Sequence, residues 1–114
     1  MSKPECITRR LLTLMVMEAM GWYDIYMSSS GNYADARHPT FSPESRNHVV
    51  DYLSGDGMVE ILSTMPMRIT PIEHERWAAE IPGTGFFAYH TELPVAVALT
   101  YILAKTGQKY ELQD

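Results

Sequence analysis

Cysteine is almost missing from this chain. The single thiol, Cys6, has no second cysteine with which to form an internal disulfide. A chain of this kind is typical of a reducing compartment. No neighbouring residue pairs Cys6 with a histidine, as a catalytic thiolate requires, so we interpret it as a structural or incidental thiol.

Long hydrophobic runs are also lacking. One apolar stretch, residues 11–20, comes after Arg9 and Arg10, which is the order found in a secretory signal. Thr13 and Glu18 interrupt this stretch, and no small-residue cleavage site comes after it. It is also too short to cross a bilayer. We therefore expect a cytoplasmic protein that makes no membrane contact.

Positive charge is scarce. Nine Lys and Arg face 14 Asp and Glu, and the formal net charge is -5. A field of this sign repels phosphate, so direct nucleic-acid binding is disfavoured. Many of the acids lie in the second half of the chain: Asp51, Asp56, Glu60, Glu73, Glu75, Glu80 and Glu92. They form either a solvated surface or a face that meets a basic groove on another protein.

Motifs for catalysis and metal binding are missing too. His74-Glu75 does not begin an H-E-x-x-H zinc motif, because Ala78 stands where the second histidine belongs. No two of the four histidines are spaced four apart on an expected helix, and there is no second cysteine. The glycine pairs at 55/57 and 83/85 lack the context of a phosphate loop and are interpreted as turns. We expect no enzyme, no metal and no cofactor.

What the chain does have is the composition of one folded domain. It is 114 residues long, 46% hydrophobic and 11% aromatic. A chain of this size can bury a modest core without disulfides or metal. Residues 1–114 are therefore expected to form a single domain.

Hydrophobic periodicity predicts an α+β element order. A first helix over 5–20 ends at Gly21, and a strand over 22–27 comes next, with Trp22 in the core. Residues 28–41 are expected to be irregular. Ser42 and Pro43 then have the pattern of a second helix start, with the helix ending at residues 55–57.

The second half is predicted to be mainly strands. They are expected over 58–64, 67–72, 76–81 and 86–90, with a turn at 82–85. Thr91 is a suitable N-cap for a final helix, which has one apolar stripe and ends at Gly107. We expect a three-layer α/β/α sandwich, with three helices on a mostly antiparallel sheet of four to five strands.

Four segments of this layout resemble a known family. They are MEAMGW at 17–22, PTFS at 39–42, ERWAAEI at 75–81 and TELPVA at 91–96. The chain is similar over residues 10–107 to the small phage and prophage proteins of the phage ABA-sandwich domain family. The resemblance implies a three-layer helix/sheet/helix fold and a phage or prophage origin, hence a bacterial host cell. It implies no catalytic residues.

Two groups of residues are candidates for partner binding. The first is the aromatic and basic segment that holds Tyr23, Tyr26, Tyr33, Arg37 and His38. These residue types are common at protein interfaces, although the same side chains can also simply pack over the sheet.

The second candidate surface is acidic. Glu73, Glu75 and Glu80 would compete for a nucleic-acid-binding surface by charge mimicry.

The function we expect is non-enzymatic binding to a host protein or complex. An inhibitor of a bacterial defence system, such as an anti-CRISPR, would have these properties. One alternative is an oligomer that sequesters a small molecule or nucleotide, with Arg37 and His38 contacting the anion. Another is a purely structural homo-oligomer.

Overall fold

The structure is a computed structural model that describes residues 4–31 and 33–113. Within these residues the chain forms three helices and eight strands. The helices are α1 (Arg9–Ala19), α2 (Gly55–Thr64) and α3 (Leu93–Thr106). The strands are β1 (Glu5–Ile7), β2 (Tyr23–Met27), β3 (Ala34–His38), β4 (Ser42–His48), β5 (Arg68–Ile72), β6 (Arg76–Ile81), β7 (Phe86–His90) and β8 (Tyr110–Leu112).

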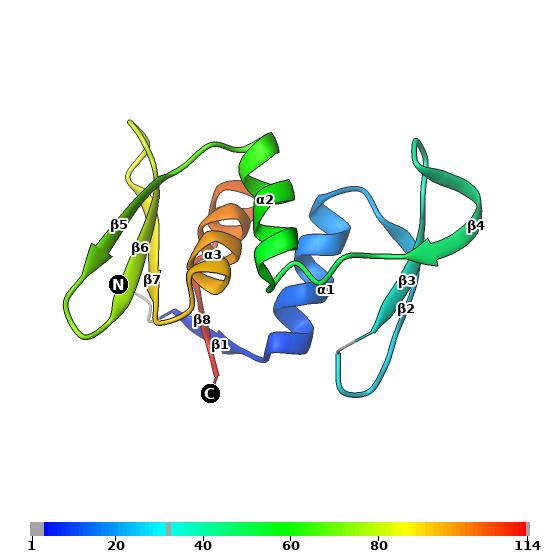
Figure 1. Ribbon diagram of the computed structural model, residues 1–114, viewed down its shortest axis with the longest axis horizontal. Coiled ribbons are helices and arrows are strands. Elements are labelled where there is room, and N and C mark those ends of the chain that lie inside the picture. The colour runs from blue at the N-terminus through cyan, green and yellow to red at the C-terminus, as the bar shows by residue number, and fades with distance from the viewer. Residues whose placement is uncertain (1–3, 32, 114) are drawn as a thin grey trace.

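The strands form three separate sheets. Two are antiparallel and three-stranded, β2–β3–β4 and β5–β6–β7, and the third is the parallel pair β1–β8. Figure 1 shows the helices side by side between the two larger sheets, which lie at opposite ends of the molecule. The long axis measures 44 Å, against 28 and 27 Å for the other two.

The predicted α+β class is confirmed, but the predicted arrangement of layers differs from the observed one. The sequence predicts one sheet of four to five strands covered by helices, whereas the described residues form eight strands with the helices between two sheets. The difference arises because α2 separates β4 from β5. Each group of hairpin-linked strands therefore pairs only within itself.

The centre of the core is α3. Its residues from Val95 to Ile102 are buried on every side, not only along the predicted apolar stripe. The helix lies against β6 and β7 at two buried alanines, Ala79 and Ala88. The buried hydroxyl oxygen of Thr100 is 2.9 Å from the carbonyl oxygens of both Ala79 and Ala96. The helix ends at Gly107 as predicted, with φ +75°.

The starts of α1 and α3 differ from the prediction, whereas the end of α1 agrees with it. The first helix begins at Arg9, capped by Thr8, because residues 5–7 pair with β8 instead. The last helix is capped at Glu92 without a side-chain hydrogen bond, so Thr91 is not its N-cap. Gly21 does come after the first helix with φ +100°, as expected for a residue that closes a helix.

The middle of the chain is predicted with the wrong elements. Residues 28–41 contain β3, and Ser42-Pro43 begins β4 rather than a helix. Residues 58–64 are helical, and the Gly55–Gly57 segment starts α2 instead of ending an earlier helix. The cap is Ser54, whose hydroxyl accepts the Gly57 N–H at 3.3 Å. The strands expected over 22–27, 67–72, 76–81 and 86–90 are confirmed as β2, β5, β6 and β7.

Candidate functional site

An irregularity in β2 decides which side chains share a face of the sheet β2–β3–β4. Tyr23 is paired with Arg37 and Tyr26 with Asp35, and the register shifts between the two tyrosines. In a regular strand, residues three apart point to opposite faces. Asp24, with φ +52°, lies in the bulge that removes this alternation. Both tyrosines therefore lie on the outer face, with Asp35 and Arg37.

The outer face of this sheet carries most of the predicted aromatic and basic candidates. We call Tyr23, Tyr26, Tyr33 and Arg37 the tyrosine face. Its three tyrosines are 42%, 52% and 46% exposed. The Arg37 guanidinium lies 5.9 Å from the centre of the Tyr23 ring, and its Nη2 donates to the Pro43 carbonyl at 2.8 Å. These contacts hold the Arg37 guanidinium in place beside the exposed Tyr23 ring.

Tyr33 extends the tyrosine face at its other end. Its hydroxyl donates to Asp35 Oδ2 at 3.3 Å, and its ring centre is 5.3 Å from that of His48. The negative charge of Asp35 raises the pKa of the Tyr33 hydroxyl above its ordinary value. Arg46 Nε lies 3.5 Å from the other Asp35 oxygen. Fixed tyrosines with balanced neighbouring charges are suited to contact with another protein.

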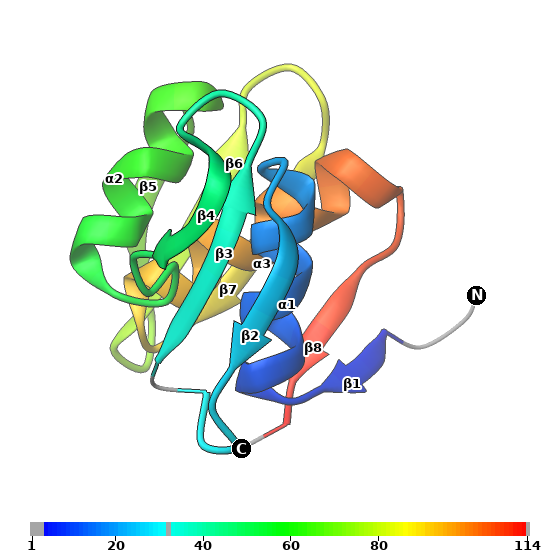
Figure 2. The same ribbon diagram turned by 90° about the vertical axis from the view of Figure 1, so that its right-hand side faces the viewer.

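His38, the remaining candidate of this group, is on the opposite side of the sheet. It comes directly after Arg37 in the same strand, so the alternation of side chains turns it inward. It lines a groove of about 1040 Å³ between α2 and the sheet. The structure therefore separates His38 from Arg37, and the two do not form one anion site. Figure 2 shows this sheet in front of α1, with α2 along one side.

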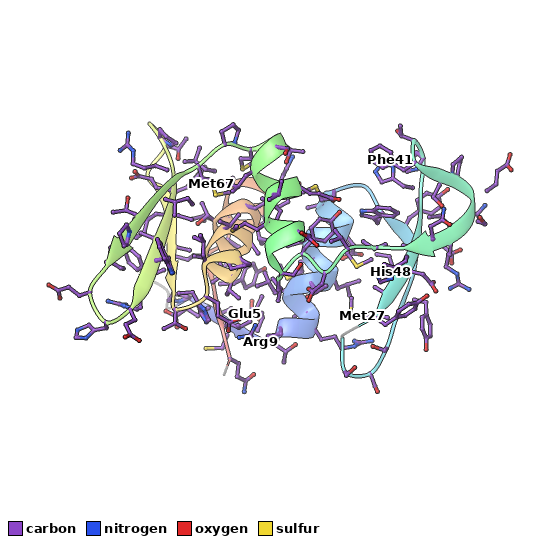
Figure 3. The ribbon with its side chains drawn as sticks, viewed as in Figure 1. Glu5, Arg9, Met27, Phe41, His48 and Met67 are labelled. Carbon is purple, nitrogen blue, oxygen red and sulfur yellow. The ribbon has the colours of Figure 1, made fainter. Side chains whose placement is uncertain are left out.

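One wall of the groove is aromatic. Trp22, His38 and Phe41 form it, with ring-centre distances of 5.0 Å from Trp22 to His38 and 4.5 Å from His38 to Phe41. Phe41 is 73% exposed and stands at the β3–β4 turn, and Figure 3 shows it at the top of this end of the molecule. The sequence prediction of Trp22 in the core is partly right, since Trp22 is half-buried against it.

The His38 ring is fixed from both sides. The Thr40 N–H donates to Nδ1 at 3.1 Å, and Nε2 is 3.0 Å from the Met20 carbonyl oxygen. Both ring nitrogens therefore have a backbone partner. Gly21 allows this position, because a Cβ there would come 2.9 Å from His38 Nε2.

The floor of the groove is Tyr52, which is 1% exposed. The Trp22 indole Nε1–H donates to its hydroxyl oxygen at 2.9 Å. Burial raises the pKa of Tyr52 to about 12, the Trp22 N–H opposes that rise, and the charge of Glu60 adds to it. Sequence reasoning misses this contact, since its two residues are 30 positions apart.

The other wall of the groove is acidic. Asp56, Glu60 and Thr64 are spaced four apart along α2 and face the groove together. Asp51 adds a third carboxylate from the segment before α2. The four-residue spacing is present in the sequence, but it indicates a common face only if residues 55–64 are helical.

The acidic candidates lie at the far end of the molecule from the tyrosine face (Figure 1). Glu73 and Glu75 are exposed at the β5–β6 turn, where Glu75 has φ +55°. Glu80 lies further along β6, about 13 Å from Arg76 at the rise of an extended strand. Its carboxylate is 3.4 Å from Arg68 Nη1. The three glutamates do not form one continuous acidic patch.

Neither a metal cluster nor a membrane-spanning helix is found in the described part of the chain. Among residues 4–31 and 33–113, no group of three or more His, Cys, Asp or Glu is placed to hold a metal ion. In the same residues, no helix combines the length and apolar composition needed to cross a bilayer.

Comparison of the chain with protein-family models, with curated proteins and with solved structures gives no match. The function of this chain is therefore inferred from its own geometry.

Proposed function

We propose that the protein acts by binding another protein through the tyrosine face. The observation that supports this is the bulge at Asp24, which places Tyr23 and Tyr26 on one exposed face next to a fixed Arg37. Tyrosine and arginine are enriched among the residues that contribute most to interface affinity. Tyr23 and Tyr33 already contact Arg37 and Asp35, which reduces the side-chain entropy that these two rings lose on binding.

The partner we propose is a protein of a bacterial host, in keeping with the resemblance to small phage proteins. Modulation or inhibition of a host complex, such as a defence system, is the proposed consequence. Around the tyrosine face, Asp24 and Asp35 balance Arg37 and Arg46. Such a surface has little net attraction for nucleic acid, which supports a protein as the partner.

The two other candidate modes have weaker support. Charge mimicry requires a continuous acidic surface, whereas Glu80 is paired with Arg68 and distant from Glu73 and Glu75. Sequestration of an anionic nucleotide would require Arg37 and His38 together. These two side chains point to opposite sides of the sheet, so that site is not assembled within one chain.

The test is retention of a partner by the tagged protein from bacterial lysate, identified by mass spectrometry, followed by calorimetry with the purified partner. We expect Tyr26→Ala to weaken the affinity about tenfold, in the range of an interface hot spot. Tyr89→Ala is the matched control, because Tyr89 is 47% exposed but lies on β7 at the other end of the molecule.

Circular dichroism and thermal unfolding should show that both variants keep the fold. If Tyr89→Ala weakens binding and Tyr26→Ala does not, the tyrosine face is not the interface. Retention of only further copies of this chain would favour the structural homo-oligomer instead.

A further inference from the structure

The groove between α2 and the sheet β2–β3–β4 has no role in the proposed protein interface, which is on the opposite face of the sheet. We propose that this groove binds a small organic cation, an amine or guanidinium with an aromatic or alkyl body. This proposal is independent of the proposed function. Three features of the groove support it: the charge of the groove, the aromatic wall and the size of the groove.

The groove is lined by three solvent-exposed carboxylates, those of Asp51, Asp56 and Glu60. Its lining also contains His38 and His48, but no Lys or Arg. Within the part of the chain that the structure describes, none of these carboxylates is within ion-pair distance of a basic side chain. A bound ammonium or guanidinium would supply the missing counter-charge and donate charge-assisted hydrogen bonds. Phosphates and other anions would be repelled.

The aromatic wall supplies a second, independent contribution to cation binding. The rings of Trp22 and Phe41 lie beside His38, 5.0 and 4.5 Å from it between ring centres. Aromatic faces attract organic cations through the ring quadrupole and also cover the apolar body of such a ligand. Thr40 and Met20 hold the His38 ring in its place in this wall.

The size and shape of the groove favour a small molecule over a protein segment. Its volume of about 1040 Å³ is at the upper end of the range for small-ligand sites. Its walls come from several parts of the chain: α2, the turn after α1, the ends of β3 and β4, the β3–β4 turn and the segment that leads into α2. Side chains from several elements around one space, with a few convergent polar groups, are typical of such sites.

Phenethylamine is a suitable first probe, because it has a flat ring and one ammonium group. Its titration into isotopically labelled protein is followed by nuclear magnetic resonance, which detects millimolar affinities. We expect saturable shifts of the Trp22 indole N–H signal and of α2 amides. The neutral analogue 2-phenylethanol should bind at least about fivefold more weakly, since it lacks the charge.

Two side chains of the groove provide variants that keep the fold. Glu60→Gln should weaken phenethylamine binding about fivefold by removing one carboxylate charge. Phe41→Ala should weaken it about threefold through loss of an aromatic contact. The matched control is Glu75→Gln, an equally charge-neutralising change at the exposed β5–β6 turn, which should leave the affinity unchanged.

Three results would overturn the proposal. The first is equal binding of the amine and the alcohol, and the second is the absence of saturable shifts up to tens of millimolar probe. The third concerns the source of the cation: if acetyl-Gly-Arg-Gly-amide binds the groove and phenethylamine does not, the occupant is a protein segment. None of these results would change the outcome of the affinity test of the tyrosine face.

Discussion

At the scale of single residues, Tyr52 links the core to the groove. Its ring is almost fully buried, and its hydroxyl is the acceptor for the Trp22 indole N–H at 2.9 Å. A half-buried indole N–H that loses its acceptor loses the free energy of that hydrogen bond, and more where water cannot replace the acceptor. The aromatic wall of the groove is therefore held in place by one hydroxyl group beneath it.

Replacement of this hydroxyl has a predictable cost. Tyr52→Phe should lower the free energy of unfolding by about 1–3 kcal/mol, because the Trp22 N–H loses its partner. Urea unfolding followed by tryptophan fluorescence measures this change. Tyr89→Phe removes an equivalent hydroxyl from an exposed ring and should have no effect. Equal stability of both variants would show that the Trp22 contact contributes nothing.

The same residue predicts a dependence of stability on alkaline pH. Burial raises the pKa of Tyr52 from 10.0 to about 12 in the folded chain. Below pH 10 both the folded and unfolded states keep the proton, so the stabilisation is complete. Between pH 10 and 12 the unfolded state ionises first, and stability falls by at most roughly 2–3 kcal/mol. Tyr52→Phe should lose this part of the slope, which urea unfolding at about pH 9 and about pH 11.5 can measure.

At the scale of elements, α2 is the helix on which the groove depends, and it begins unusually, with two glycines in its first turn. A Cβ on Gly57 would overlap the backbone of Asp51 and Tyr52. A Cβ on Gly55, two residues earlier, would meet nothing within 4 Å. Gly57 therefore permits the close approach of the preceding segment, which positions Tyr52 as the groove floor.

These two glycines give a prediction in which two effects have opposite signs. Helix propensity alone favours alanine over glycine by up to about 1 kcal/mol. Steric overlap at Gly57 outweighs this preference, so Gly57→Ala should destabilise the protein by roughly 2 kcal/mol or more. Gly55→Ala should leave stability unchanged or slightly increased. Thermal unfolding of both variants shows whether helix propensity or steric overlap dominates. A Gly57→Ala protein that is more stable than the original would contradict the close approach of residues 51 and 52 to Gly57.

The elements that could be predicted from sequence are those with local signals. Strands β6 and β7 are joined by the turn expected over 82–85, and α3 ends at a glycine with φ +75°. The middle of the chain gives misleading local signals. Ser42-Pro43 has the pattern of a helix start but lies in β4, where Ser42 is buried and Asn47 donates to its hydroxyl. Tertiary contacts decide whether this segment becomes a helix or a strand.

The candidate site was predictable to a similar extent. The residue types of the tyrosine face were identifiable, because Tyr and Arg clustered in one segment. Their common face was not, since it depends on a bulge at Asp24 that has no local sequence signal of its own. The groove was missed altogether. Its walls come from residues 20–64, and the spacing of Asp56 and Glu60 is informative only once α2 is known.

At the scale of the whole molecule, the short strands near the two ends of the described chain join distant parts of the sequence. Strand β1 pairs in parallel with β8, and the Gln113 N–H donates to the Ile7 carbonyl at 2.6 Å. Ile7 is 4% exposed, with Tyr110 and Leu112 also packed on the core. The pair thus closes one side of the helical layer between the two large sheets (Figure 1).

Removal of β8 should therefore destabilise the fold as a whole rather than fray one end. A chain that stops after Gln108 loses the apolar cover of Ile7 and the side chains of Tyr110 and Leu112. Burial of this much apolar surface is worth roughly 2–4 kcal/mol, so urea unfolding should show a stability lower by that amount. Glu111→Ala, an exposed change in the same strand, should alter stability by less than about 0.5 kcal/mol. Because β8 contacts α3, hydrogen exchange should accelerate in α3 as well as in β1. Acceleration confined to residues 5–7 would mean that the terminal pair is an appendage and not part of the cooperative unit.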